Sequence, residues 1–237
     1  MFENLESRTL LTSVNLESGV LSIEGSRKVD TVTVSQTDTY VFVNIGAKVR
    51  KQFRGGKVDR IEIRTLDGPD VVRLISVASQ ETSIRAYIDG GAGGDQLGGG
   101  NGRDTILGGT GDDQIDGFAG HDRLDGGAGH DKLWGGEGYD KIFGGDGDDD
   151  VYGDASSTGP PVAGRPGNDT IVGGAGNDKL FGDFGNDLIK GDAGFDLLQG
   201  NDGADTMHGG TDDDTLWGGG GTDALLPSLG NDEIRQD

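Results

Sequence analysis

The chain has 237 residues, of which 48 are Gly and none is Cys, and its formal net charge is −22. Apolar residues make up 32% of it, against a usual share of about 45–50%. These values exclude disulfide staples and argue against an ordinary helical globule, because Gly weakens helix and strand interiors. The negative charge makes nucleic acid and an anionic membrane surface poor partners. No apolar run reaches the roughly 18 residues of a membrane span.

Residues 1–89 carry equal numbers of acidic and basic side chains and read as strands. Polar residues alternate there with apolar or β-branched ones, which is the pattern of half-buried strands, in the segments 19–25, 30–36, 40–45, 60–66, 70–76 and 83–89. We interpret this region as irregular, longer solenoid rungs that cap the following repeats. A separate small β-sandwich is the alternative.

From Gly90 the chain falls into nine-residue units. Seven units run over 90–152, an insertion covers 153–163, seven more run over 164–226, and a degenerate unit closes the series at 227–235. Position 8 is always aliphatic or Met, and position 6 is Asp in all fifteen units: Asp95, Asp104, Asp113, Asp122, Asp131, Asp140, Asp149, Asp169, Asp178, Asp187, Asp196, Asp205, Asp214, Asp223 and Asp232.

The first six positions of each unit have the composition of a turn that binds a hard cation. Gly permits tight turning and leaves backbone carbonyls unobstructed, while the Asp adds carboxylate oxygens. Ca²⁺ takes 6–8 such oxygen ligands, whereas zinc and copper call for His or Cys. Besides the fifteen Asp residues, the candidate ligands are the carbonyls of Gly91, Gly93, Gly100, Gly102, Gly109, Gly111, Gly127, Gly129, Gly136, Gly138, Gly174 and Gly176.

Positions 7–9 form a three-residue strand that needs its equivalents as neighbours. Two units then make one coil of a solenoid, the side chain at position 8 points inward, and each turn stacks on the turn two units further along. An ion between stacked turns gives five sites in each block of seven units, or about ten Ca²⁺ in all. A stretch before the regular units, at 65–73, looks like a decayed repeat with Asp70 at position 6. The sequences around Asp30 and Asp59 match the repeat more weakly.

This pattern resembles the RTX (repeats-in-toxin) haemolysin-type calcium-binding family, whose nonapeptide is G-G-x-G-x-D-x-U-x. The resemblance covers 90–235 and implies an all-β fold, a right-handed parallel β-roll with Ca²⁺ in its turns. It also implies an extracellular or cell-surface protein that folds when it meets external calcium. The sequence departs from the family at position 4 in Asp212 and at position 2 in Phe118, Arg165, Asp183, Asp192, Asn201 and Ser228.

Two further sets of side chains have a defined place in the repeat. His121 and His130 both occupy position 5, on opposite edges, so we interpret them as exposed variable residues and not as a zinc pair. Position 9 faces outward and holds four aromatic residues that share one sheet face if the insertion preserves the register: Trp134, Tyr152, Phe181 and Trp217. They form an exposed stripe for a carbohydrate or partner protein, or they are scattered surface aromatics, or they lie on a face that the N-terminal region covers.

Catalytic signatures are absent, since the sequence contains no H-E-x-x-H, G-x-S-x-G or G-x-x-x-x-G-K-[ST]. We therefore predict an exported, calcium-binding structural or adhesion module without catalysis. Its expected partners are calcium ions and an extracellular glycan or cell-surface protein, with no nucleic acid and no membrane span. The alternatives are a polysaccharide-modifying enzyme or its accessory module, and self-assembly into a surface layer through the solenoid ends.

Overall fold

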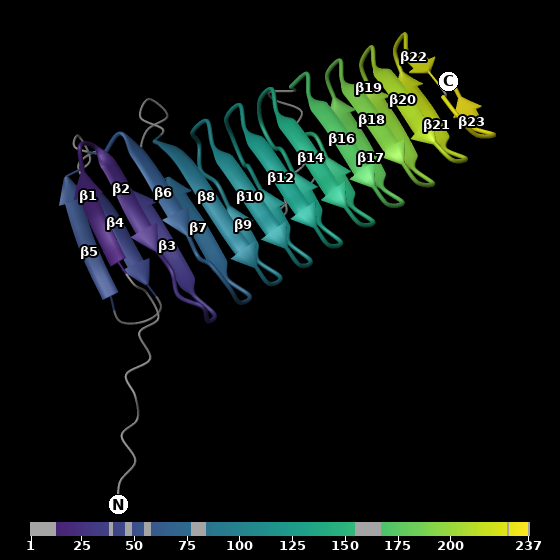
Figure 1. Cartoon of the computed structure of the whole chain (residues 1–237). Coiled ribbons are helices and arrows are strands. Elements are labelled where there is room, and N and C mark those ends of the chain that lie inside the picture. Colours follow the sequence, from purple (N-terminus) through teal and green to yellow (C-terminus); the bar gives the residue numbers. More distant parts are fainter. Residues whose placement is uncertain are drawn as a thin grey trace, which may run out of the picture.

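The fold is described from a computed structural model, which covers residues 13–37, 40–45, 49–54, 58–76, 84–154, 167–226 and 228–236. Over these residues the chain forms strands and turns and no helix, and the coils stack along one long axis (Figure 1). No helix long and apolar enough to cross a membrane occurs in these ranges.

The strands fall into an N-terminal group and a repeat group. The N-terminal strands are β1 (Ser13–Glu17), β2 (Val20–Glu24), β3 (Thr31–Gln36), β4 (Tyr40–Ile45), β5 (Val49–Arg54), β6 (Arg60–Arg64) and β7 (Val71–Ser76). The repeat strands are β8 (Arg85–Ala92), β9 (Gln96–Gly98), β10 (Thr105–Thr110), β11 (Gln114–Asp116), β12 (Arg123–Ala128), β13 (Lys132–Trp134), β14 (Lys141–Asp146), β15 (Asp150–Tyr152), β16 (Thr170–Ala175), β17 (Lys179–Phe184), β18 (Leu188–Ala193), β19 (Leu197–Asp202), β20 (Thr206–Thr211), β21 (Thr215–Gly220), β22 (Ala224–Leu226) and β23 (Glu233–Arg235).

Successive strands of the repeats alternate between two parallel sheets. The first sheet has the order β1-β2-β6-β8-β10-β12-β14-β16-β18-β20-β22, and the second has the order β23-β21-β19-β17-β15-β13-β11-β9-β7-β3-β4-β5. Each coil therefore contributes one strand to each sheet and pairs in register with the coils before and after it; Leu133, for example, lies between Ile115 and Val151. The predicted all-β parallel roll is confirmed.

The core is a single layer of side chains from position 8. From Leu97 in the first unit to Leu216 in the thirteenth, each of these side chains is buried, and most are completely inaccessible. At the C-terminal end the burial fades, because Leu225 is only partly buried and Ile234 is 44% exposed. One apolar side chain per strand is thus all that separates the two sheets.

The N-terminal strands extend the same two sheets. Strand β6 pairs in parallel with β8, and β7 pairs in parallel with β9, so neither sheet breaks where the repeats begin. Antiparallel pairs occur only at that end among the described strands, between β1 and β2 and along β3, β4 and β5. This continuity (Figure 1) argues against a separate β-sandwich.

The insertion leaves the register of both sheets intact. Tyr152 pairs with Phe181, and β14 pairs with β16. A side chain at Gly153 would meet Asp169 and the Gly182 carbonyl, which are equivalent to the contacts of the first-position glycines in the described turns from Gly90 to Gly200. The interrupted unit therefore begins at Gly153, and the additional residues follow Asp154, whereas the sequence pattern placed the insertion at 153–163 and began the unit at Gly164.

Replacing Leu133 by Ala should lower the free energy of unfolding in saturating calcium by about 2–5 kcal/mol. The cavity would lie between Ile115 and Val151 in a one-layer core, where no other side chain can fill it. Urea denaturation followed by circular dichroism measures the change. The matched variant Ile234→Ala, at an exposed site in β23, should change stability by about 0.5 kcal/mol or less. Equal losses in both variants would contradict a core that depends on the buried rungs.

Candidate metal centre

The turn of the fifth unit, residues 126–134, illustrates the geometry of the repeats. Gly129, at position 4, has φ +144, and a Cβ there would overlap the carbonyl oxygen of Gly111 in the preceding coil. Only glycine fits this close approach, and its φ lies in the region that glycine favours. Turns of successive coils therefore stack backbone on backbone, which brings a column of carbonyl groups to each edge of the roll.

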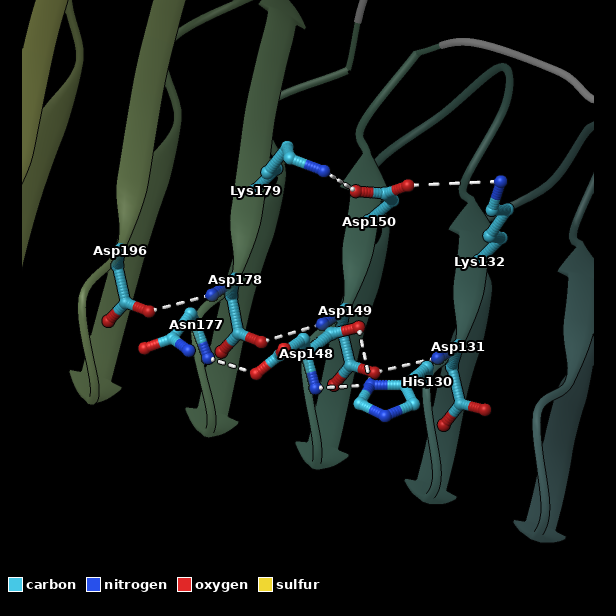
Figure 2. A network of polar contacts seen from close by, with 10 residues as sticks. All are labelled: His130, Asp131, Lys132, Asp148, Asp149, Asp150, Asn177, Asp178, Lys179 and Asp196. Atoms are coloured by element: carbon cyan, nitrogen blue, oxygen red, sulfur yellow. Dashed lines mark hydrogen bonds and ion pairs between the residues drawn. The ribbon is translucent and has the colours of Figure 1, made fainter.

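The Asp at position 6 ties each turn to the next. Asp131 donates its backbone N–H to Oδ1 of Asp149, one coil later, at 2.8 Å. Bonds of this kind join position-6 residues thirteen times in all, at 2.7–3.1 Å, and we call the series the Asp ladder. The series continues across the insertion from Asp140 to Asp169. Figure 2 shows this Asp ladder from Asp131 to Asp196.

In most members of the Asp ladder, the second carboxylate oxygen has no hydrogen-bond partner. Oδ2 is buried and unpaired in twelve members: Asp95, Asp113, Asp122, Asp131, Asp140, Asp149, Asp169, Asp178, Asp187, Asp196, Asp205 and Asp214. A buried acceptor left in this way costs about 1–3 kcal/mol. Twelve such oxygens at equivalent positions indicate that a ligand completes each turn.

Oxygen atoms of two stacked turns lie close together beside the glycine at position 1. A Cβ on Gly126, at position 1, would overlap Oδ2 of Asp131 and lie 2.6 Å from the carbonyl oxygen of Gly144 in the next coil. Carboxylate and carbonyl oxygens from two stacked turns therefore converge where glycine leaves room. Among the described residues, no three Asp, Glu, His or Cys side chains gather at one point. Main-chain carbonyls must then supply much of the donor set, which suits Ca²⁺ and not zinc.

Burial raises the pKa of the ladder carboxyls. Desolvation is the largest cause, neighbouring carboxylates add to it, and the backbone N–H bonds oppose it. The pKa rises to about 9 for Asp122 and Asp169, to about 8 for Asp187, and to about 7 for Asp113 and Asp149. Without a cation, Asp122, Asp169 and Asp187 hold protons near neutral pH, and a positive charge beside them would favour their ionised form.

The predicted glycine ligands occupy the stacked backbone of the turns. A Cβ at position 2 or position 4 would press on a carbonyl oxygen of the preceding coil for Gly91, Gly93, Gly109, Gly111, Gly127, Gly129, Gly136, Gly138, Gly174 and Gly176. The second unit differs. Gly100 donates its N–H to Oδ2 of Asp104, Ala86 donates to Oδ1, and Gly102 lies against the Ile84 carbonyl. Asp104 therefore has a partner on both oxygens, unlike the ladder members that follow it.

Most residues that depart from the family pattern keep the backbone shape of the turn. Phe118, Asp183, Asp192 and Asn201 replace glycine at position 2 with φ between 70 and 74, and Asp212 at position 4 has φ 76. Positive φ is uncommon for residues other than glycine, although Asn and Asp adopt it most readily. Arg165 lies outside the described residues.

Sequence reasoning missed a second ladder at position 5. His130 accepts the Asp148 N–H on Nδ1 at 2.9 Å, and Asp148 accepts the Asn177 N–H at 2.8 Å (Figure 2). On the opposite edge, His121 accepts the Tyr139 N–H and stacks on its ring. The two histidines are exposed and unpaired with each other, as predicted, but they carry hydrogen bonds between coils. Asn and Asp recur at position 5, and that recurrence was the available signal.

The Asp ladder also begins earlier than the regular repeats. Asp30 donates its N–H to Asp70, and Asp70 donates to Asp95, at 2.6 and 2.7 Å. Both N-terminal residues are buried, so the decayed repeats at Asp30 and Asp70 take the structural place that their spacing predicts. Asp59 is exposed and makes no ladder bond in the described structure. Asp154, which no pattern singled out, is buried and accepts the N–H groups of Gly167 and Phe184 across the insertion.

In EDTA, lowering the pH from about 8 to about 5 should increase the β-sheet signal of the metal-free chain in far-UV circular dichroism. The folded-state pKa is about 6 for Asp95, about 7 for Asp113 and about 9 for Asp122, against 3.8 for the ordinary group. A group with a raised folded pKa stabilises the fold at low pH, and this contribution is lost as the pH rises through the folded value. A signal that stays constant or falls over this range would contradict the buried ladder.

Comparison with known families agrees with this geometry. The family model of the RTX calcium-binding nonapeptide repeat matches the chain four times, over residues 98–133, 126–157, 164–198 and 199–234, which is more than half of its length. A search of the curated proteins gave no match. RTX repeats bind Ca²⁺ and form parallel β-rolls. The two parallel sheets and the oxygen-lined turns of this chain agree with that description. The chain therefore belongs to the RTX calcium-binding nonapeptide repeat family.

Proposed function

We propose that this protein is an extracellular module that folds when Ca²⁺ enters its turns and then acts as a structural or adhesive unit without catalysis. One observation carries the proposal: twelve position-6 Asp residues each keep one carboxylate oxygen buried and unpaired. A fold that leaves so many acceptors unsatisfied is unstable by itself. Cations in the turns would remove that cost.

The ladder Asp residues and the turn carbonyls are the proposed ligands. Each ion would lie between two stacked turns, with Oδ2 of the Asp and the glycine carbonyls around it. The charges are then close to balanced, because about ten Ca²⁺ offset most of the −22 net charge. Because the register is unbroken, two more candidate ion sites between stacked turns lie across the insertion, and one more lies at the last unit. These add to the ten sites predicted within the two blocks.

Folding and metal binding would be one event, because the ligands come from turns that form only when coils stack. Extracellular calcium modules bind with dissociation constants of about 10⁻⁴–10⁻³ M. At cytosolic calcium the acidic repeats would then stay unfolded, and outside the cell they would fold. This difference supports an exported protein. The most strongly perturbed carboxyls, such as Asp122 and Asp169, belong to the Asp ladder, which supports a structural and not a catalytic use.

Adding millimolar CaCl₂ to the chain in chelator-free buffer at about pH 8 should convert a disordered circular dichroism spectrum into a β-sheet spectrum. EDTA should reverse the change, and MgCl₂ at the same concentration should not reproduce it, because Mg²⁺ requires a smaller octahedral shell. Calorimetric titration gives the number of ions bound. A β-sheet spectrum that survives EDTA at this pH would refute calcium-driven folding.

Asp131→Asn should raise the calcium concentration at the folding midpoint and lower the number of bound ions. The amide keeps an oxygen for the Asp113 N–H but replaces the unpaired oxygen with a donor group, which cannot bind a cation. Asp146→Asn is the matched control, because it removes the same charge at an exposed position of a neighbouring turn. Its midpoint should stay close to that of the parent chain. Equal shifts in the two variants would mean that only net charge matters.

A further inference from the structure

Three outward aromatic side chains form a continuous stack on the second sheet. The Trp134 and Tyr152 rings lie 6.0 Å apart between centroids, the Tyr152 and Phe181 rings lie 5.0 Å apart, and each pair is inclined by only 7°. The three residues come from neighbouring strands β13, β15 and β17. Trp217 is separated from this aromatic stack by the Gln199 rung. The described N-terminal strands prolong the sheets and do not cover this face (Figure 1).

The aromatic stack ends at a hollow in the same sheet face. The residue in register with Trp134 on β11 is Asp116, whose side chain is small, and the next one on β9 is Gly98. A groove of about 280 Å³ opens there over strands β7, β9, β11 and β13. Its lining includes Trp134 and Phe118. We call it the Trp134 groove.

One face of the Trp134 indole is directed at the groove. Tyr152 stacks on the side of the indole toward the C-terminus, so the ring face that borders the groove is the opposite one. The ring is held by its neighbours before any ligand arrives, and this preorganisation reduces the entropy lost on binding. An aromatic face fixed at the wall of a hollow is a stacking platform for a second ring.

The rest of the groove lining combines the apolar side chains Val72, Leu74, Ile75 and Leu97 with polar ones. Gln96 and Gln114 lie side by side in register on β9 and β11, and Arg73 and Asp116 complete the set. Arg73 makes no ion pair with any described residue, so its guanidinium donors face solvent. Two carboxamides, a guanidinium and a carboxylate beside an aromatic face provide donors and acceptors around a flat apolar surface.

We propose that the Trp134 groove binds one pyranose ring of an oligosaccharide, with the C–H face of the sugar on the indole and its hydroxyls on Arg73, Gln96 and Gln114. A sugar ring has this combination of one apolar face and a rim of hydroxyl groups. A purely apolar ligand would leave Arg73, Gln96 and Gln114 without hydrogen-bond partners, which costs binding energy. Asp116 already accepts the Phe118 N–H. The inference rests on the calcium-folded roll proposed above.

The first sheet provides an outward aromatic side chain for comparison. Phe143 occupies position 9 there, but the Arg123 guanidinium lies 4.2 Å from its ring centroid and covers one face. Its partners in register are Asp125 and Val172, so it has no aromatic neighbour. Phe143 is therefore a suitable control for general surface aromaticity.

The test is calorimetric titration of the calcium-loaded full chain with cellohexaose, chitohexaose and hexagalacturonate. We expect at least one of them to bind with a dissociation constant of about 1 mM or tighter. Trp134→Ala should weaken that binding at least about tenfold. Trp217→Ala, which changes the same residue type at the same repeat position away from the groove, and Phe143→Ala should each leave it within about twofold.

A second variant separates binding from stability. Asp116→Phe places an aromatic ring in the rung next to Trp134, where it extends the aromatic stack and occupies the groove. It should abolish sugar binding while the calcium-loaded circular dichroism spectrum is retained. A folded, calcium-loaded chain that binds none of the three sugars overturns the sugar site alone, as does binding that survives both Trp134→Ala and Asp116→Phe. A chain that fails to fold with calcium overturns the proposed function and with it this inference.

Discussion

The structure depends on the different roles of the two carboxylate oxygens in the Asp residues of the ladder. One oxygen accepts a backbone N–H from the preceding coil, as Asp149 does from Asp131, and this bond fixes the spacing and register of the turns. The same bond immobilises the carboxylate and directs the other oxygen into a buried space without a partner. A hydrogen bond that holds the coils together thus creates the need for a cation.

The thin core follows from this constraint. With one inward side chain per strand, such as Leu133 or Ile142, the roll buries little apolar surface for its length. Conformational entropy opposes folding at roughly 1–2 kcal/mol per residue, and a Gly-rich chain loses more of it than most. The proposed ions at the edges of the roll would add the interactions that a thicker core otherwise provides. The low apolar content is therefore compatible with a folded chain once this metal contribution is included.

The sequence predicted the repeating parts of the molecule and missed those that break the repeat. Asp at position 6 and an aliphatic residue at position 8 are dictated by the turn and the core, so spacing alone located Asp131 and Leu133. The interrupted unit was assigned to Gly164 because Gly167 and Asp169 fit the pattern from there, but contacts between coils place its start at Gly153. The position-5 ladder was missed because His, Asp and Asn can each accept the backbone N–H of the position-5 residue one coil later. The residue type therefore varies while the hydrogen bond persists.

The turns and the aromatic stack share the same strands, which links the two sites physically. Lys132, Asp150 and Lys179 form exposed ion pairs on the strands that carry Trp134, Tyr152 and Phe181 (Figure 2). Exposed pairs of this kind contribute little to stability, so the backbone pairing of these strands and the ladder at their edge hold them at stacking distance. On the proposed function, loss of calcium would separate the coils, so the rings would lose their contacts and the Trp134 groove would lose the wall that defines it. Sugar binding at that groove should therefore depend on calcium even though no cation touches the sugar.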